Sequence, residues 1–541
     1  MEANSKLIST FFALLSMGLV ACSAVSQEPS TVGANRFSGQ IVVDLGWDKY
    51  DGFRRGFDPT LGWSYSNPLL FQSTLLSRNE KLELVNDLAQ SYSISSDRKV
   101  WKFNIRKDAR FTDGQPLTAE DVAYTYNKTK DSPGHRDLRI LERAIATSKH
   151  SVELHLKQPQ ITFTQELTTL GIVPKHAHNK NYPRNPIGSG PYRLVQWVEG
   201  EQVVIEANPN YYGEKPKIKR VVFLFSRGDA AFAAARAGQV HVADVPYSLA
   251  PKPIEGMTLY RTKSVGHAGL MFPYPPNTGK KTPQGYPIGN DVTSDLAIRR
   301  AVNYAIDRKV LVNSILEGNG SPATGPADGM PWFEPTAAIG DADIDKARQI
   351  LAEAGWKDTD GDRILDKGGL KAEFKLLYAA QDAHRQGLAL AVAQMVKPVG
   401  IRIIPEGRNW TEIERRMQSN TVLYMTSNRG PQQLHFYYKS TEARGKSQNP
   451  GYYANPVVDA AIDAAMTSQS EQKANVFWRQ VQWNGQTGVT TKGDAASAWM
   501  VNFDKTYFVS NCLDIGKNKE QSNRYRGSIF TNLPQWQWIC Q

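Results

Sequence analysis

VWKFNIRKDARFTDGQPLTAEDV, residues 100–122, holds a strand pattern, a turn and a helix start within 23 residues. Apolar and polar residues alternate from Val100 to Ile105, which is typical of a strand with one buried face. Asp113-Gly114 predicts a turn, because glycine tolerates the positive φ that many turns need. Thr118, with Asp121 three residues later, predicts the capped first turn of a helix. This succession favours a mixed α/β fold.

The same patterns recur along the chain. Strand-like alternation is found at residues 151–156 and 203–206. Apolar periodicity predicts one long amphipathic helix over 295–316 and another over 343–354, which Gly355 ends. Strands that alternate with helices predict α/β lobes. A chain of 541 residues is too long for one hydrophobic core, so we expect two or three domains.

The N-terminus carries an export signal. Lys6 precedes a short apolar run from Leu7 to Val20, and the small residue Ala21 comes before Cys22. The sequence Leu19-Val-Ala-Cys22 resembles the bacterial lipobox, in which the cysteine is acylated and becomes the first mature residue. We therefore predict a signal peptide at 1–21, a lipid on Cys22 that anchors the protein to a membrane, and a flexible tether at 22–37.

Cysteine and charge content limit the remaining classes. Besides Cys22, the chain has only Cys512 and Cys540, which form one possible disulfide in an oxidising compartment. A reactive thiol is the alternative, but no supporting His or Asp pattern lies nearby. The net charge is +11, but the basic residues are interspersed with acidic ones along the chain. They do not form the basic stripe of a nucleic-acid-binding module. The positive net charge indicates a basic surface or a site for anionic ligands.

Several stretches form an ordered set that spans the mature chain. They are 88–92, 101–106, 111–122, 186–194 (PIGSGPYRL), 208–216 (NPNYYGEKP), 299–308 (RRAVNYAIDR), 322–326, 346–356 and 453–459. In this order they resemble the extracellular solute-binding proteins of the peptide/nickel type, family 5. We interpret these motifs as scaffold and assign them no ligand contact.

The resemblance implies a two-lobed α/β fold of the type II periplasmic-binding-protein kind, with an extra subdomain in the first lobe. Lobe I would comprise 38–267, with an inserted subdomain at about 66–180, and lobe II would comprise 268–498. Residues 499–541 would return to lobe I, and the two crossing segments would act as the hinge. Closure over the ligand is expected to be a ligand-driven population shift that the importer recognises.

The ligand-defining stretch of this family corresponds to residues 424–438, YMTSNRGPQQLHFYY. Peptide-binding relatives usually place an aspartate here that pairs with the ligand's amino group. This chain departs from that pattern, because no Asp or Glu lies between Arg415 and Thr441 and Arg429 stands in the segment. A guanidinium binds carboxylates and repels ammonium groups. The segment therefore favours a ligand that carries carboxylates.

Nickel-importing relatives are thought to bind the metal as a chelate with small organic acids or histidine, through Arg and aromatic side chains. The resemblance thus implies a comparable set of ligand-binding residues here: Trp410, Tyr424, Arg429, Tyr452 and Tyr453, with Arg136 and Arg139 facing them from the other lobe. The structural alternative is that Arg429 pairs with a carboxylate of the protein and that the tyrosines are ordinary packed residues.

No residues are assigned as direct metal ligands or as a catalytic set. His435, beside three aromatic residues, is interpreted as a packed side chain, and His176 and His178 lack a common metal-binding spacing. Residues 358–362 (DTDGD) fail the EF-hand pattern, which favours a solvated turn. No nucleophile elbow, zinc-protease motif or glycine-rich phosphate loop is found.

The sequence therefore predicts a non-catalytic, monomeric substrate-binding lipoprotein of an ABC importer, in the periplasm or another extracytoplasmic compartment, without a cofactor of its own. Its partners would be the importer's permease subunits. The favoured ligand is a nickel or other transition-metal chelate. A short peptide is the main alternative, with opine-like or other anionic solutes behind it. A secreted enzyme, or an additional adhesin or chaperone-like role, are the interpretations from other classes.

Overall fold

The computed structural model describes residues 39–45, 56–63, 69–132, 138–426, 430–443, 448–516 and 528–540. The chain divides into Met1–Ser38 and Gly39–Gln541, and every described residue lies in the second unit. The predicted signal peptide, the tether with Cys22, and the predicted ligand contacts Arg136 and Arg429 lie outside the described residues and stay predictions. Among the residues that are described, no helix is long and apolar enough to cross a membrane.

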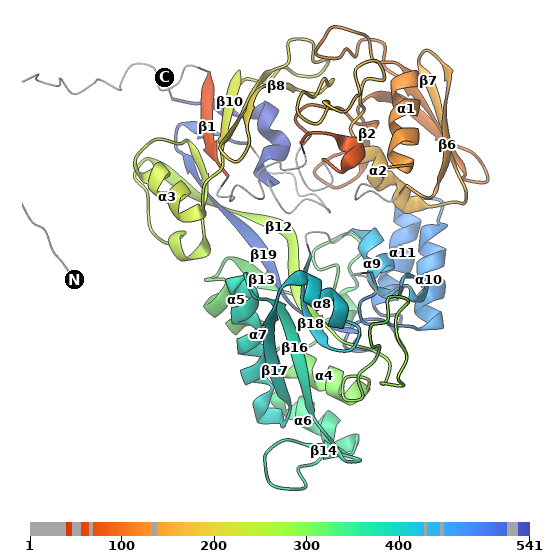
Figure 1. Ribbon diagram of the computed structural model, residues 1–541, viewed down its shortest axis with the longest axis vertical. Coiled ribbons are helices and arrows are strands. Elements are labelled where there is room, and N and C mark those ends of the chain that lie inside the picture. The colour runs from red at the N-terminus through yellow and green to blue at the C-terminus, as the bar shows by residue number, and fades with distance from the viewer. Residues whose placement is uncertain are drawn as a thin grey trace, which may run out of the picture. The chain divides into compact units, whose positions relative to one another are not determined.

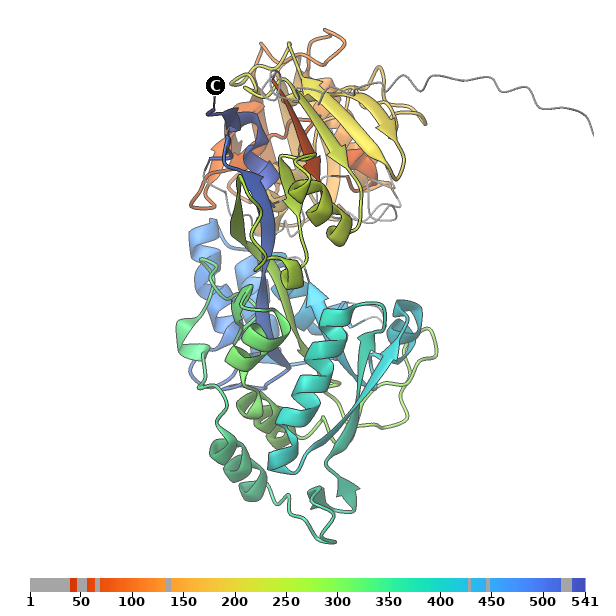
Figure 2. The same ribbon diagram turned by 90° about the vertical axis from the view of Figure 1, so that its left-hand side faces the viewer.

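One large sheet runs through the unit, with the strand order β17-β16-β18-β12-β19-β11-β1-β10-β9-β8 and with β13 paired to β19. Its strands are β1 (Gln40–Asp44), β8 (Tyr192–Val198), β9 (Gln202–Ala207), β10 (Arg220–Leu224), β11 (Val242–Asp244), β12 (Met257–Met271), β13 (Gly320–Pro322), β16 (Glu373–Ala379), β17 (Arg402–Arg408), β18 (Thr421–Thr426) and β19 (Ser497–Ser510). The antiparallel pair β12 and β19 forms its centre and is continuous from one half to the other (Figures 1 and 2).

Each half of the sheet attaches to a different part of this central pair. The end of β12 nearer Met271 pairs with β18, whereas the end of β19 nearer Ser510 pairs with β11. The crossing points expected at 267/268 and 498/499 fall inside β12 and β19. In the described part of the chain, these two antiparallel strands are thus the only sheet connection between the halves, which makes them the natural bending elements.

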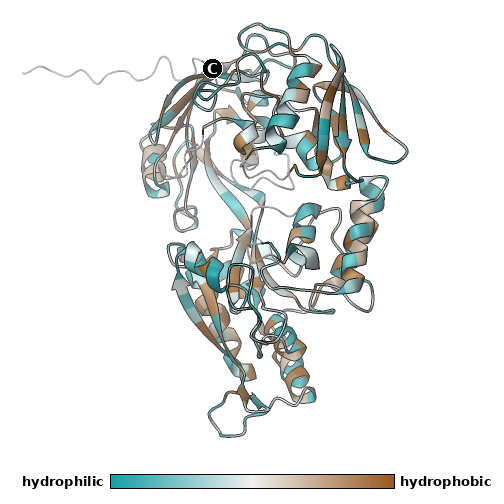
Figure 3. Ribbon diagram, turned by 45° about the vertical axis from the view of Figure 1, so that its right-hand side comes forward, coloured by the Kyte–Doolittle hydropathy of each residue, from teal (hydrophilic) through white to brown (hydrophobic). Residues whose placement is uncertain are grey.

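The inserted subdomain of lobe I has its own antiparallel sheet in the order β4-β5-β7-β6. Its elements are β2 (Leu76–Arg78), β3 (Leu84–Asn86), β4 (Ala89–Ile94), β5 (Val100–Ile105), β6 (Leu141–Ser148), β7 (Ser151–Leu156), α1 (Ala119–Lys130), η2 (Ile161–Phe163) and α2 (Thr164–Thr169). The predicted strand at 100–105 and the predicted helix start are confirmed: the Asp121 carboxylate accepts hydrogen bonds from the Thr118 backbone and hydroxyl. Hydrophilic and hydrophobic residues alternate on these strands (Figure 3).

Lobe II contains most of the helices. They are α4 (Leu296–Ala305), α5 (Arg308–Ile315), α6 (Ile344–Glu353), α7 (Ala383–Met395), α8 (Trp410–Arg416), α9 (Pro431–Tyr438), α10 (Pro456–Met466) and α11 (Glu471–Gln482), while α3 (Gly228–Arg236) lies in lobe I. The single helix predicted over 295–316 is wrong, because Ile306 is extended and Asp307 caps a second helix. The helix predicted to end at Gly355 is confirmed, with Gly355 at φ 83°.

Most buried apolar residues form separate clusters in the two halves, and the lobe I residues Tyr247 and Ile161 join the clusters of lobe II. One cluster joins the β16 and β18 side of the sheet to α4, α5 and α7, and another packs α9 to α11 against Trp499. In the other half, one cluster lies around β1, β9 and β10 and one inside the inserted subdomain. Separate cores define separate lobes. The observed fold is therefore the predicted two-lobed α/β class.

The C-terminal segment returns to lobe I. It contains β20 (Leu513–Asp514), η7 (Ser528–Gln535) and β21 (Gln537–Trp538), and Trp536 is fully buried in the core around β1. A disulfide joins Cys512 to Cys540, next to the β20–β21 pair. This covalent link holds the last described residues against the end of β19.

Candidate functional site

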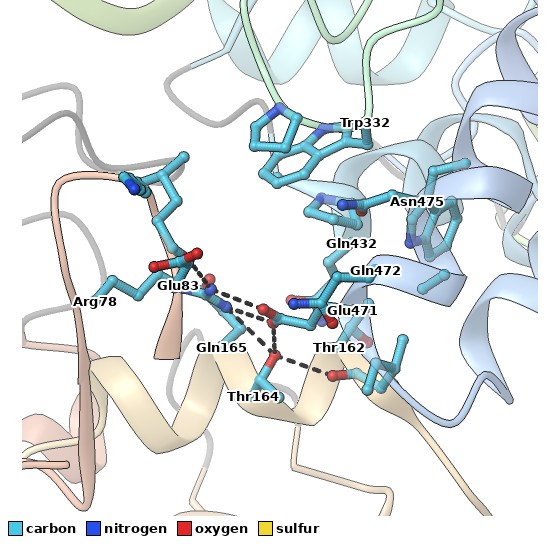
Figure 4. A pocket seen from close by; sticks show the side chains of 18 residues that line it. Arg78, Glu83, Thr162, Thr164, Gln165, Trp332, Gln432, Glu471, Gln472 and Asn475 are labelled. Atoms are coloured by element: carbon cyan, nitrogen blue, oxygen red, sulfur yellow. Dashed lines mark hydrogen bonds and ion pairs between the residues drawn. The ribbon is translucent and has the colours of Figure 1, made fainter. Parts of the chain in front are cut away.

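A pocket with a cavity volume of about 220 Å³ lies between the two lobes (Figure 4). From the inserted subdomain it is lined by β2, the β2–β3 turn, η2 and the start of α2. From lobe II it is lined by the loop at Pro331 and Trp332 and by the N-terminal turns of α9 and α11. Because both lobes supply its walls, any group held here is enclosed only when the lobes are close together.

An ion pair crosses this pocket from one lobe to the other. Arg78 Nη2 lies 2.7 Å from Glu471 Oε1, and Arg78 Nη1 donates to Glu471 Oε2 at 3.0 Å. The Thr164 hydroxyl donates to the same Oε1 at 2.7 Å. The Arg78 and Glu471 side chains are 12% and 29% exposed, so the pair is largely shielded from solvent. Burial, together with the negative charge of Glu471, also raises the pKa of nearby Tyr92.

Local structure fixes both partners of this pair. Arg78 ends β2, and its Nη1 also donates to the Leu82 carbonyl across the β2–β3 turn. Glu471 is the first residue of α11, which Ser470 caps by accepting a hydrogen bond from Lys473 N. A carboxylate in the first turn of a helix is stabilised by the helix dipole. Glu471 is therefore well placed to hold Arg78.

The rest of the pocket wall is formed by uncharged groups, except for Lys81 and Glu83. Its polar members are Thr162, Gln165, Gln432, Gln472 and Asn475. The Trp332 side chain lies on the opposite side of the pocket from Arg78 (Figure 4). The backbone carbonyl of Trp332 accepts a hydrogen bond from the Gln482 side chain of α11 at 2.6 Å. Gln165 Nε2 is buried and has no hydrogen-bond partner in the described part of the chain. These amides and this aromatic ring suit a ligand group with both polar and apolar surface.

Two of the predicted ligand contacts, Trp410 and Tyr424, lie together in lobe II. Their ring centroids are 5.9 Å apart, and Tyr424 also packs edge-on against Tyr437 at 5.5 Å. The Arg385 guanidinium lies 5.7 Å from the Trp410 ring. Neither Trp410 nor Tyr424 lines the pocket. Their ligand role stays a prediction for a neighbouring part of lobe II.

The structure favours a packing role for Tyr453. This side chain is 2% exposed, and its hydroxyl donates to Asp494 Oδ2 at 2.6 Å. Burial and the negative charge of Asp494 raise the pKa of Tyr453 far above its usual value. Tyr453 therefore belongs to the core of lobe II and presents no surface to a ligand in this structure.

The other described candidates are less enclosed. Tyr452 is half-buried at φ 53°, and Arg139 is exposed between α1 and β6. Neither lines the pocket. Arg429 itself is outside the described residues, but the next residue in the chain, Gly430, does line it.

The residues interpreted as unsuited to metal binding have structural partners. His178 bonds Tyr124 and Asp58, and His176 bonds Asp113. Among the described residues, the one cluster with metal-ligand types is Asp358, Asp360 and Asp366. Asp358 accepts from the backbone of Gly361 and Arg363, and Asp360 pairs with Lys371, as in the predicted solvated turn.

Sequence reasoning missed Arg78, Thr164, Gln165, Trp332 and Glu471. These residues are distant in sequence and belong to no spacing motif, so only the packing of two lobes brings them together. Of the lining residues, Gly430, Pro431 and Gln432 lie within the segment 424–438 that the resemblance singled out. A single sequence contains no signal for the others.

The fold and the interlobe pocket define a class, the two-lobed α/β binding protein. Residues 83–447 match the family described as "Bacterial extracellular solute-binding proteins, family 5 Middle". The chain belongs to this family, and it is accordingly the substrate-binding protein of an ABC importer, in the periplasm or another extracytoplasmic compartment. The family comprises transport proteins rather than enzymes.

Known relatives differ in the ligands that their names state. Protein XP55 of Streptomyces lividans is 34% identical over 483 residues, which cover 86% of this chain and 84% of that protein. The oligopeptide-binding protein AppA of Bacillus subtilis is 28% identical over 444 residues, 76% of this chain and 78% of AppA. Its structure with a nonapeptide has a TM-score of 0.70 at 23% identity and covers 93% of this chain and 99% of that one.

A nickel-binding structure is similar to the same degree. NikZ from Campylobacter jejuni in complex with Ni(L-His) has a TM-score of 0.74 at 21% identity, and covers 92% of this chain and 99% of that one. At this identity the likeness shows the fold alone. The comparisons therefore support the family and the transport class and leave the ligand open between peptide and nickel.

Proposed function

We propose that this protein captures a transition-metal chelate bearing carboxylates, with nickel as the favoured metal, and delivers it to its importer without catalysing a reaction. The main support for this proposal is the pocket between the lobes. It is lined by Arg78 and Gln165 from one lobe and by Trp332 and Gln432 from the other. A site of this kind closes around a small solute and opens to release it.

The charge of the adjacent segment supports an anionic ligand. Residues 415–441 contain Arg429 but no acidic residue that could neutralise a ligand's ammonium group. An arginine offers two parallel hydrogen-bond donors to a carboxylate. An aminocarboxylate chelate supplies such a carboxylate, whereas a peptide N-terminus does not. The nickel–histidine complex of the NikZ structure is a ligand of this type.

A short peptide is the second candidate. It is favoured by the similarity to AppA over three quarters of the chain. The amide-rich pocket wall also suits peptide groups, because side-chain amides donate and accept hydrogen bonds.

A titration followed by tryptophan fluorescence distinguishes the two candidates. Purified protein, stripped of bound ligand, is titrated with nickel alone, L-histidine alone, both together, and a pool of short peptides. We expect a saturable change only with nickel and histidine together, and about a tenfold or greater loss of that affinity in Arg429→Ala, because a charge-assisted pair is removed.

Arg415→Ala is the matched control, since Arg415 is 57% exposed and lies on α8 of the same lobe. It should bind like the parent. A saturable response to peptides alone would overturn the chelate proposal, and an unaltered affinity in Arg429→Ala would overturn the placement of the site.

A further inference from the structure

The Arg78–Glu471 pair is distinctive among the ion pairs of the described residues, because it alone joins lobe I to lobe II. Its two partners are 393 positions apart in the chain. The pair lies on the side of α11 that faces α2, away from the strands β12 and β19 that connect the lobes (Figure 1). The pair therefore joins the inserted subdomain of lobe I to α11 of lobe II, two surfaces that the strands β12 and β19 do not connect.

Further contacts extend the bridge along the same edge. The Thr162 hydroxyl of the inserted subdomain donates to Met466 Sδ, at the end of α10, at 3.6 Å. Arg98, in the turn between β4 and β5, donates to the Thr467 carbonyl. These two contacts and the Arg78–Glu471 pair all join the inserted subdomain to residues 466–471, which connect α10 to α11.

The carboxylate oxygens and both Nη atoms of the pair are used within the protein, while Arg78 Nε has no partner among the described residues. Both Glu471 oxygens accept hydrogen bonds from Arg78, and Oε1 accepts another from Thr164. Both Nη atoms of Arg78 donate to Glu471, and Nη1 donates also to the Leu82 carbonyl. A ligand carboxylate would have to displace Glu471 from Arg78 and leave a half-buried carboxylate without its cation, which is unfavourable.

We propose that Arg78, Thr164 and Glu471 form a latch that stabilises the closed arrangement of the lobes and takes no part in recognising ligand charge. As a consequence, this pair binds no charged group of the solute, whose polar groups are bound by the side-chain amides of the wall, with Gln165 Nε2 as a donor that has no partner among the described residues. The inference about the solute rests on the proposed function, whereas the latch itself does not.

A charge swap separates a latch from a ligand-binding arginine. We expect Arg78→Glu and Glu471→Arg each to speed dissociation of the bound probe, nickel with L-histidine or a short peptide, by about tenfold. The double variant Arg78→Glu/Glu471→Arg should recover the parent dissociation rate to within about fivefold. Recovery should be incomplete because the swap places a cation in the first turn of α11, where the helix dipole disfavours it. If Arg78 recognised a ligand carboxylate, the double variant would bind no better than Arg78→Glu.

Small-angle X-ray scattering tests the latch without a ligand, because the radius of gyration increases when the lobes move apart. The ligand-free Arg78→Glu protein should have a larger radius of gyration than the parent, and the double variant should return to the parent value. Equal radii for the parent and Arg78→Glu, with and without probe, would overturn the latch. Failure of every probe to bind the parent would count against the proposed function and leave this scattering test of the latch intact.

The control is the Arg416–Glu406 pair, which is also bidentate, at 2.9 and 3.1 Å, but lies wholly within lobe II. Its side chains are 24% and 15% exposed, similar to those of the latch. Arg416→Glu should lower the free energy of unfolding and leave the radius of gyration unchanged. A rise in radius equal to that of Arg78→Glu would show that any lost ion pair loosens the protein and would overturn the latch.

Discussion

Arg299 and Arg308 show how motif residues act in this protein. Both lie in the 299–308 stretch that carries the family resemblance, and both are about as buried as core residues, at 2% and 1% exposure. Arg308 donates to the carbonyls of Ala323 and Trp499 and pairs with Asp341 at 3.1 Å. Arg308 thereby joins a loop to the central sheet, and Arg299 donates to the carbonyls of Thr293, Ser294 and Asp494. The interpretation of this motif as scaffold agrees with these contacts.

Gly188 and Gly190 make a comparable structural contribution. A Cβ on Gly188 would lie 1.9 Å from the Phe71 carbonyl oxygen, and one on Gly190 would lie 2.7 Å from the Phe71 carbonyl carbon. The chain just before β8 thus passes so close to another backbone segment that no side chain fits at either position.

Tyr453 provides a test at this scale. We expect Tyr453→Phe to lower the free energy of unfolding in urea by about 1–2 kcal/mol, because a buried hydrogen bond to the Asp494 carboxylate is lost. The affinity for the probe ligand should stay the same. Tyr304→Phe removes a hydroxyl that forms no hydrogen bond with the described residues and is the control. A large loss of affinity in Tyr453→Phe at unchanged stability would restore Tyr453 to the ligand site.

At the scale of elements, local signals were sufficient where they concerned caps and alternation. Thr118 with Asp121 marked the start of α1, and Gly355 marked the end of α6. The failure at 295–316 has a local cause that apolar periodicity does not register. The periodicity continues through Ile306, but its ψ of 125° breaks the helix, and Asp307 supplies a new N-cap.

The cap of α5 can be tested directly. The Asp307 carboxylate accepts a hydrogen bond from Val310 N at 2.8 Å. We expect Asp307→Ala to cost about 1 kcal/mol of unfolding free energy, measured in urea, because a first-turn donor loses its acceptor. Asp307→Asn keeps an acceptor and should recover most of the loss. Equal stability of Asp307→Ala and the parent would mean that α5 is held by packing alone.

At the scale of the whole molecule, the order of motifs was enough to predict two α/β lobes and a pair of crossing segments. It was not enough to find the pocket, because Arg78, Gln165, Trp332 and Glu471 meet only when two independently folded cores come together. The predicted ligand contacts that are described, such as Trp410 and Tyr424, lie elsewhere in lobe II, and their role awaits a bound ligand.

Hydrogen–deuterium exchange with and without the probe ligand tests most directly whether a solute is held between the lobes. We expect slower exchange on both sides of the pocket at once, at the start of α2 in lobe I and at the first turns of α9 and α11 in lobe II. Residues 397–402 of lobe II, a short helical turn that leads into β17 and is distant in the fold from α2, serve as the internal reference and should be unchanged. Slower exchange confined to one lobe would contradict capture between the lobes.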